Sequence, residues 1–531
     1  MGLMPGILLG SRPVLWHNQS MSLHKIALID IGSNSMRLEI VAIRGGDFWT
    51  VARYKSSARI ASGMYPSFII TPEAIERACA ALRDFRKRIA LHQVEELRCV
   101  ATSAVRDARN RDEVLSRLSA SLEEPVEILD GEQEGLYSCL GVQNGFDRGD
   151  ALVFDIGGGS AELIDLQGQR PGTVLTLPLG AVRLSEMFFE NRGRPSPAEW
   201  KRMERHIASV LEESGLFTRP FPGLVGVGGT ARQLARISQK LRSYPFHPDI
   251  HHYEIPSREV ARITKRIGRR LTPEQARTFN IGADRSDILP AGMAVISAIT
   301  VLSRAPVLTF SHYGLRQGLF MEHYQKTVGM EEGPVSRATL RRIARRYGRI
   351  RDSKPFRDTL HELLRLLIPS GLPSERLLLL CDMLGTLALL PVFHNPSPNT
   401  RELWDLLLHG DLPGLSQRDR LLCGLILCQT EERPGRQKKK GHPYLRHLNK
   451  EDQRLLGILT PLLALARDIL LASGGRSATL SYRTPVLRIL PPNHEESDES
   501  LSLAMTESRD LGLGHPLSIQ WFSAPEAAHE S

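Results

Sequence analysis

One strand-turn-strand pattern occurs twice in this chain and limits its possible folds more than any other feature. Residues 26–41 contain an apolar strand ending at Asp30, a polar turn that starts with glycine, and a second alternating strand. Residues 153–164 repeat the plan, with Asp155 followed by three glycines. Both segments therefore predict a β-hairpin whose turn lets a ligand approach the backbone closely.

The spacing of the two patterns indicates two related domains. They lie roughly 125 residues apart, which is too far for a solenoid repeat and suits two sibling domains. Such domains would place both turns on one cleft, where successive N–H groups form a concavity suited to phosphate. Asp155 and Glu162 add negative charge beside the turn, which is consistent with phosphate only if a divalent cation lies between them.

Charge is unevenly distributed along the chain. The chain has 531 residues, which is enough for about three or four domains. Its formal net charge is +9. Lys and Arg are in excess over residues 331–490, whereas the sequence is acidic from 491 onward. A basic module indicates a polyanionic partner, which is a nucleic acid, a membrane surface or polyphosphate. The alternative is an ordinary solvated charged face.

Cysteine usage and apolar runs predict a cytoplasmic protein. The six cysteines form no CxxC pair, which fits buried thiols in a reducing compartment. Residues 1–20 lack a basic region and a cleavage site, so we expect no signal peptide, and Met21 is an alternative start. Asp382 and Arg467 interrupt the longest apolar stretches, so we expect no transmembrane helix.

Two further stretches contain residue types used in phosphate chemistry. A strand over 97–101 leads into a hydroxyl-rich turn with Arg106, which is either a phosphate contact or an ordinary surface arginine. After the strand that ends at Leu129, Glu132 and Glu134 are either acid/base groups or acidic residues that favour a helix N-terminus. Spacing alone leaves both choices open. A third strand-to-glycine turn spans residues 224–232.

These motifs, taken together, resemble the exopolyphosphatase / guanosine pentaphosphate phosphohydrolase family. The resemblance covers about residues 23–325 and rests on six segments in order: D-I-G-S-N-S at 30–35, A-T-S-A-V-R-D-A at 101–108, D-G-E-Q-E-G at 130–135, D-I-G-G-G-S-A-E-L at 155–163, G-V-G-G-T at 226–230 and G-L-R-Q-G at 314–318. It implies the actin/Hsp70/sugar-kinase architecture, in which two ribonuclease-H-like α/β domains hold phosphate between paired hairpins.

The resemblance also implies an activity and roles for individual residues. The activity is hydrolysis of a terminal phosphoanhydride, with Glu134 as the general base for water and Asp155 and Glu162 as the carboxylates for a divalent ion, expected to be Mg²⁺. Arg106 resembles the family's phosphate-contacting arginine. The remaining phosphate-binding candidates are Gly32, Ser33, Asn34, Ser35, Gly157, Gly158, Gly159, Ser160, Gly228, Gly229 and Thr230.

Some positions depart from the family pattern. Ala161 replaces a frequent Thr, Gln317 replaces the usual Glu, and residues 311–313 alter the approach to the last motif. These departures affect substrate preference more than the type of reaction. Longer family members carry a helical domain resembling HD-type phosphohydrolases, and here Cys381 stands in place of that fold's histidine ligand. We therefore expect a degenerate HD-like module without a metal centre.

Basic clusters in the helical part form a candidate track for a long polyanion. The track residues are Arg341, Arg342, Arg345, Arg346, Lys438, Lys439 and Lys440. The predicted organisation is an N-terminal extension (1–22), two actin-like α/β domains (23–148 and 149–328), a helical, basic HD-like domain (329–490) and an acidic disordered tail (491–531).

The function expected from these features is that of an exopolyphosphatase acting on inorganic polyphosphate. A guanosine pentaphosphate (pppGpp) phosphohydrolase is the alternative with the same chemistry, and a non-catalytic polyphosphate or alarmone sensor is a third hypothesis. A sugar kinase is disfavoured because no segment resembles a sugar site. We expect neither nucleic acid nor membrane as a partner, and the expectations include a homodimer.

Overall fold

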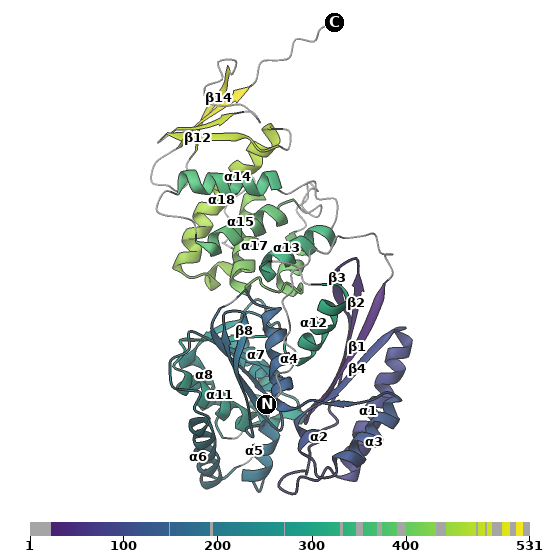
Figure 1. The fold of residues 1–531 in the computed structure, drawn as a ribbon. Coiled ribbons are helices and arrows are strands. Elements are labelled where there is room, and N and C mark those ends of the chain that lie inside the picture. Colours follow the sequence, from purple (N-terminus) through teal and green to yellow (C-terminus); the bar gives the residue numbers. More distant parts are fainter. Residues whose placement is uncertain are drawn as a thin grey trace.

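The computed structural model describes most of the chain between its two ends. The described residues are 23–147, 149–191, 195–269, 271–329, 333–346, 354–368, 374–389, 400–431, 442–473, 476–483, 486–490, 502–509 and 517–523. They form two α/β domains, a helical region and a small C-terminal sheet (Figure 1).

The first α/β domain is built on a five-stranded sheet of order β3-β2-β1-β4-β5. Its strands are β1 (His24–Ile31), β2 (Met36–Arg44), β3 (Asp47–Ser56), β4 (Glu96–Ala101) and β5 (Glu127–Ile128). Its helices are α1 (Pro72–Leu91), α2 (Ser103–Asp107), α3 (Arg111–Leu122) and α4 (Gly131–Gln143). Ile29 and Leu38 of the sheet share a buried core with Phe85 of α1.

The second α/β domain has a six-stranded sheet of order β10-β11-β9-β6-β7-β8. Its strands are β6 (Ala151–Ile156), β7 (Ala161–Gln167), β8 (Arg170–Leu177), β9 (Leu224–Val227), β10 (Glu254–Pro256) and β11 (Val307–Phe310). Its helices are α5 (Ala181–Phe188), α6 (Pro197–Glu213), α7 (Gly228–Leu241), α8 (Ser257–Ile267), α9 (Pro273–Thr278), α10 (Ala283–Ser286), α11 (Leu289–Ser303) and α12 (Leu315–Thr327).

The two domains are siblings, as the repeated pattern predicts. In each, the first strand pairs antiparallel with the second and parallel with the fourth: β1 with β2 and β4, and β6 with β7 and β9. Both predicted hairpins are present, at β1–β2 and β6–β7. Three helices begin where the local sequence favours it, because Thr71, Ser196 and Thr272, each followed by proline, cap the helix that follows.

Two helices are exchanged between the domains. α4 follows the first sheet but packs on the second, where Val142 shares a core with Val153 and Val225. α12 follows the second sheet but packs on the first, with Leu319 against Leu28. The helices cross each other closely. A Cβ atom on Gly318 would lie 1.8 Å from the carbonyl oxygen of Tyr137, so this crossing requires glycine.

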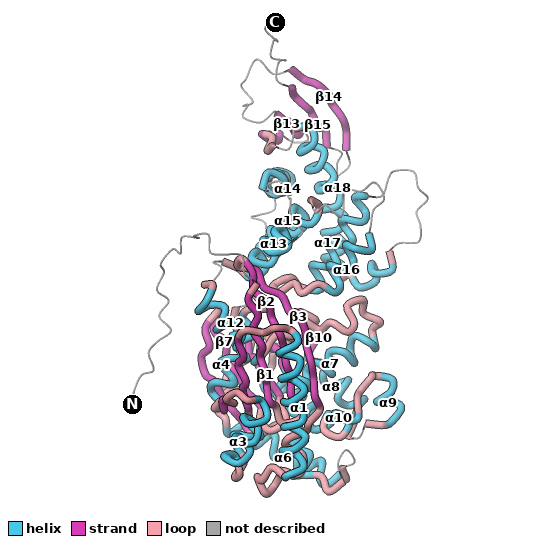
Figure 2. The backbone as a smooth tube through the Cα atoms, turned by 90° about the vertical axis from the view of Figure 1, so that its right-hand side faces the viewer, coloured by secondary structure: helices cyan, strands magenta, loops and turns pink. Residues whose placement is uncertain are grey.

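The helical region lies on one end of the α/β part (Figure 2). It comprises α13 (Val335–Arg346), α14 (Lys354–Leu367), α15 (Glu375–Leu387), α16 (Thr400–His409), α17 (Gln417–Glu431), the 3₁₀ helix η2 (Pro443–His447) and α18 (Lys450–Ala472). Two hydrogen bonds are among the side-chain contacts that join it to the second α/β domain. Gln417 Nε2 donates to the carbonyl oxygen of Asp249 at 3.0 Å, and the Tyr313 hydroxyl donates to Asp411.

α18 is long and apolar enough to cross a membrane, unlike any other described helix. In the structure several of its leucines, including Leu459 and Leu463, are buried in the core of the helical region together with Leu363 of α14. Packing within the protein therefore accounts for the apolar composition of this helix.

The C-terminal part departs from the prediction. A four-stranded sheet, of order β12-β13-β15-β14, follows α18. It consists of β12 (Thr479–Arg483), β13 (Val486–Leu490), β14 (Ser502–Arg509) and β15 (Leu517–Ser523). The expectation that residues 329–490 are helical throughout is therefore wrong for its last segment, and a disordered tail is wrong for 502–509 and 517–523. Apolar alternation explains the difference, since Leu517 and Ile519 are fully buried.

Candidate active site

The two hairpin turns meet in one cleft between the α/β domains. A Cβ atom on Gly158 would lie 2.6 Å from Ser33 Cβ, so the second turn packs directly against the first. Asp30 and Asp155, at the ends of β1 and β6, line the same pocket. The shared cleft expected from the repeated pattern is therefore present.

Most of the predicted phosphate-binding residues line this pocket. They are Gly32, Ser33, Asn34, Ser35, Gly157, Gly158, Gly228, Gly229 and Thr230. Gly159 and Ser160 do not line it, because Gly159 faces the first domain, where a Cβ atom would lie 2.6 Å from Ser103 Oγ. Gly228 has φ of +88°, and a side chain there would also collide with Asp155 Oδ1. The pocket wall thus depends on glycine at this position.

Glu134 is the buried one of the two glutamates in the first turn of α4. Asp130 caps this helix by accepting from the backbone N–H of Gln133, so neither glutamate is needed as the cap. Glu132 is exposed, whereas Glu134 is buried and lines the pocket. Burial raises the pKa of Glu134 to about 7, with a further rise from Asp155 and an opposing effect of Arg106.

Arg106 contacts Glu134 and does not line the pocket. Its Nη1 donates to Glu134 Oε2 at 2.8 Å and to the carbonyl oxygen of Leu129 at 3.1 Å. The predicted phosphate-contacting arginine is thus placed behind the acid, where it orients the carboxylate.

Asp155 and Glu162 are direct cross-strand partners in the β6–β7 hairpin. The side chain of Glu162 is almost completely buried, and its Oε1 accepts no hydrogen bond from the part of the chain that the structure describes. Burial raises the pKa of Asp155 against the opposing effect of Arg232. Burial also raises the pKa of Glu162, and the nearby carboxylates of Glu134 and Asp155 raise it further. An unpartnered acceptor among buried carboxylates is the environment that a divalent cation would stabilise. Glu162 reaches this cluster from behind the pocket, which it does not line.

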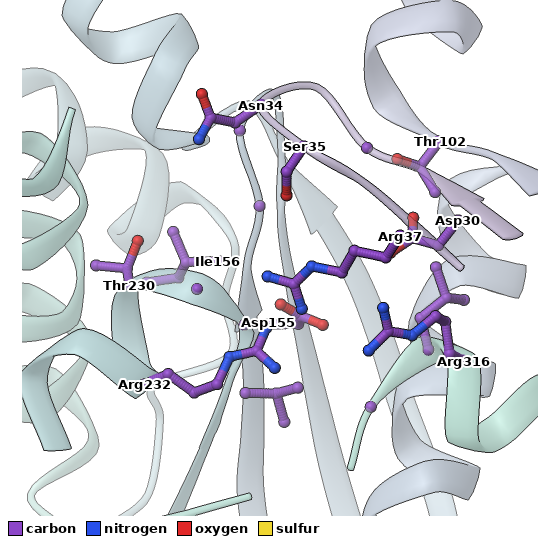
Figure 3. A pocket seen from close by; sticks show the side chains of 18 of the residues that line it. Asp30, Asn34, Ser35, Arg37, Thr102, Asp155, Ile156, Thr230, Arg232 and Arg316 are labelled. Atoms are coloured by element: carbon purple, nitrogen blue, oxygen red, sulfur yellow. The ribbon is translucent and has the colours of Figure 1, made fainter. Parts of the chain in front are cut away.

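Buried arginines that sequence analysis missed surround these carboxylates. Figure 3 shows Arg37, Arg232 and Arg316 pointing into the pocket around Asp155 from three different elements. Burial and Arg316 lower the pKa of Arg37 to about 10. Burial and then Arg37 lower the pKa of Arg232 well below its usual value. Such repulsion between buried cations favours the binding of a polyanion.

Glu39 holds two pocket arginines in place. Its Oε1 accepts from Arg53 Nε at 2.9 Å, and its Oε2 lies 3.4 Å from Arg316 Nε. The sequence contains one signal for part of this cluster. Arg37 and Glu39 alternate along a strand that is otherwise apolar, so both charges point to the face that carries Asp30.

The predicted polyanion track is only partly assembled. Arg342 and Arg346 of α13 line a groove that shares Arg53, Tyr313 and Gln317 with the active-site pocket. Arg341 and Arg345 do not line this groove, and Arg345 lies 3.5 Å from an Asp47 oxygen. Lys438, Lys439 and Lys440 lie outside the described residues.

Cys381, which stands in place of the histidine ligand of an HD-type fold, lies within α15 next to Asp382. Asp382 is 3.3 Å from both Arg337 and His361. Burial opposes ionisation of Asp382, but its contacts with His361 and Arg337 hold its pKa below the usual value.

Comparisons with known proteins place this site in a family. Residues 39–327 match the model of the Ppx/GppA phosphatase family. A "Guanosine-5'-triphosphate,3'-diphosphate pyrophosphatase" of Vibrio vulnificus is 25% identical over 513 residues, which cover 93% of this chain and 98% of that protein. A Haemophilus influenzae protein provisionally named an exopolyphosphatase is 27% identical over 306 residues, which cover 56% of this chain and 91% of its own length.

Solved structures show the same fold for the α/β part. The crystal structure of an exopolyphosphatase from Cytophaga hutchinsonii has a TM-score of 0.54 and 24% identity, and the match covers 58% of this chain and all of that chain. The first two domains thus have the actin-like fold expected from the resemblance. An HD-like fold for the helical region remains a prediction.

Proposed function

The chain belongs to the Ppx/GppA phosphatase family, and we propose that it acts as an exopolyphosphatase, which releases orthophosphate from the end of inorganic polyphosphate. The observation that carries this proposal is the composition of the cleft. Backbone turns from both domains and at least three buried guanidinium groups converge beside a buried acid with a pKa near 7. Phosphoryl transfer requires this combination of positioning and charge neutralisation.

Glu134 is the proposed general base. A water oxygen attacks the terminal phosphorus while the bond from that phosphorus to the bridging oxygen breaks. The water proton passes to the Glu134 carboxylate, and the shortened polymer leaves with the bridging oxygen. A base with a pKa near the working pH is suited to this transfer, and Arg106 keeps the carboxylate oriented through its 2.8 Å contact.

Asp155 and Glu162 are the proposed ligands of a divalent cation, with Asp30 beside them. Mg²⁺ is the preferred choice because it is commonly held by one or two carboxylates together with substrate phosphates. The unpartnered Oε1 of Glu162 fits this assignment. When bound, the cation would neutralise charge on the phosphate oxygens.

The groove along α13 is the proposed path for the rest of the polymer. It continues from the pocket past Arg53, and Arg342 and Arg346 line it farther out. Repeated cations along a groove favour a long anion over a compact one.

Hydrolysis of pppGpp is the second candidate, and a specific observation favours it. The match to the Vibrio vulnificus pyrophosphatase covers 93% of this chain and so includes the helical region, whereas the Haemophilus influenzae match covers 56%. The proposed cation and base would act on the 5′-terminal phosphoanhydride of a nucleotide in the same way.

The test is phosphate release from long-chain polyphosphate and from pppGpp, measured with Mg²⁺ for wild type, Glu134→Gln and Glu132→Gln. Glu132 is a matched control because it lies on the same helical turn but is exposed. We expect turnover of polyphosphate by wild type and Glu132→Gln only. Turnover of pppGpp alone would replace the first candidate by the second. Equal turnover by Glu134→Gln, or binding without turnover by wild type, would contradict the catalytic assignment.

A further inference from the structure

A second cluster of metal-ligating side chains lies far from the cleft, at the other end of β1. It combines His24 of β1, Glu96 of β4 and His323 of α12, whose ligand atoms all lie within 4.8 Å of one another. His24 Nε2 is 3.1 Å from Glu96 Oε1, and His323 Nδ1 is 3.4 Å from Glu96 Oε2. His24 lies six residues before Asp30 on β1, which corresponds to about 20 Å.

We propose that His24, Glu96 and His323 bind a divalent transition-metal ion of the zinc class. Two imidazoles and one carboxylate form a donor set that suits zinc, cobalt, nickel or copper better than magnesium. Bonds of about 2.0–2.2 Å in a tetrahedral zinc site place neighbouring ligand atoms roughly 3.3–3.6 Å apart. The observed separations from Glu96 are close to this spacing, so small side-chain shifts would complete the site around one open position.

A neighbouring carboxylate orients one of the histidines for this role. Glu95 contacts Nδ1 of His24, which leaves Nε2 of the same ring facing Glu96. Metal-ligating histidines commonly donate their second ring N–H to a carboxylate in this way, which fixes the tautomer and raises ligand basicity. Glu95 is therefore a positioning residue in this proposal.

The second histidine is largely enclosed. Its side chain is 15% exposed, and its Nε2 is buried without a hydrogen-bond partner among the described residues. The other ring nitrogen, Nδ1, faces Glu96 and is the atom that would bind the metal.

The position of the cluster indicates a structural role. α12 comes from the second α/β domain, packs on the first sheet and carries Arg316 at its N-terminal end. A metal ion bound to His323 would join this helix to the first residues of β1 and β4 (Figure 1). The ion would thus fix the exchanged helix in place without contacting the cleft.

The test is a zinc chloride titration by calorimetry, on full-length protein freed of metal by a chelator and kept in excess Mg²⁺. The variants are His24→Gln, His323→Gln and Glu95→Gln, with His206→Gln on α6 as the matched control. Circular dichroism checks that each variant is folded. We expect one zinc site in wild type and His206→Gln that is absent from both ligand variants, and about 10- to 100-fold weaker binding in Glu95→Gln.

Thermal unfolding supplies a second readout that does not depend on activity. Zinc should raise the melting temperature of wild type and His206→Gln, and should have no such effect in His323→Gln. Zinc bound at the cleft carboxylates would be common to all variants and would not discriminate among them. An equal zinc stoichiometry in wild type and both ligand variants, or no difference in their thermal response, would overturn the proposal.

Discussion

The two hairpins of the cleft share one register but carry opposite charges at the same position. Asp30 pairs across the strands with Arg37 in the first hairpin, whereas Asp155 pairs with Glu162 in the second. Both partners lie seven residues after the aspartate. The first pair therefore presents a guanidinium to the cleft, whereas the second presents the Asp155 carboxylate with that of Glu162 behind it.

This difference indicates that the two hairpins have different functions. An aspartate next to an arginine is locally neutralised, so the first hairpin can offer its remaining N–H groups to phosphate. Burial raises the pKa values of Asp155 and Glu162, and Asp155 raises that of Glu162 further, so a bound cation would stabilise this pair. We infer that the first hairpin mainly holds the anion and that the second mainly holds the metal.

The largest expected effect comes from making the second pair a copy of the first. Glu162→Arg places a permanent positive charge at a buried position that we assign to a metal-binding carboxylate. An uncompensated buried charge typically costs about 3–5 kcal/mol. Phosphate release should fall by two to three orders of magnitude or more, at roughly 1.4 kcal/mol per tenfold. Glu212→Arg, on the exposed face of α6, is the control and should retain wild-type activity. Normal turnover by a folded Glu162→Arg protein would refute this difference in function.

Removal of the cation from the first hairpin should weaken substrate binding. Arg37→Met deletes a charged hydrogen-bond donor worth about 1.5–3 kcal/mol, which corresponds to roughly a 10- to 150-fold rise in KM. Steady-state phosphate release over a range of substrate concentrations measures this change. If KM were unaltered, the arginine would not contact the phosphate chain.

The pH dependence tests the acid that lies between the hairpins. Glu134 must be ionised to accept a proton, and its pKa is raised to about 7. The value of kcat/KM should therefore fall about tenfold per pH unit below 7 and level off above it. Glu132→Gln should keep the same profile. A profile that stays flat down to pH 5 would indicate that another group activates water.

The smallest effect is expected in the groove beside α13. Arg346→Gln removes one exposed cation, and such contacts contribute about 0.2–1 kcal/mol. Turnover of long-chain polyphosphate should fall up to about fivefold, with little change for short chains. Arg341→Gln is the matched control because that residue lies on the same helix but outside the groove. Equal losses for long and short chains would argue against a polymer path.

The parts of this molecule that could be predicted from sequence are those set by local pattern. Glycine turns between apolar strands predicted both hairpins, and the repeat predicted that they share a cleft. Capping residues such as Thr71 and Ser196 predicted where helices begin. Glu134 followed from a family motif, and its burial then separated it from exposed Glu132.

The remaining features depend on contacts between distant segments. Arg232 and Arg316 come from different helices, and only the closed fold brings them beside Arg37 (Figure 3). Gly318 belongs to a motif associated with the cleft, but its own role is the close crossing of α12 over α4. Arg106 was assigned to phosphate from its motif, whereas tertiary contact pairs it with Glu134.

The most direct test is a Mg²⁺ titration of phosphate release by wild type, Glu162→Gln and Arg37→Met, each assayed at saturating substrate. If the second hairpin holds the metal and the first holds the anion, the Mg²⁺ concentration for half-maximal activity should rise about 10- to 100-fold in Glu162→Gln. The same concentration should stay within about twofold of wild type in Arg37→Met. Equal shifts in the two variants, or no shift in Glu162→Gln, would contradict the account.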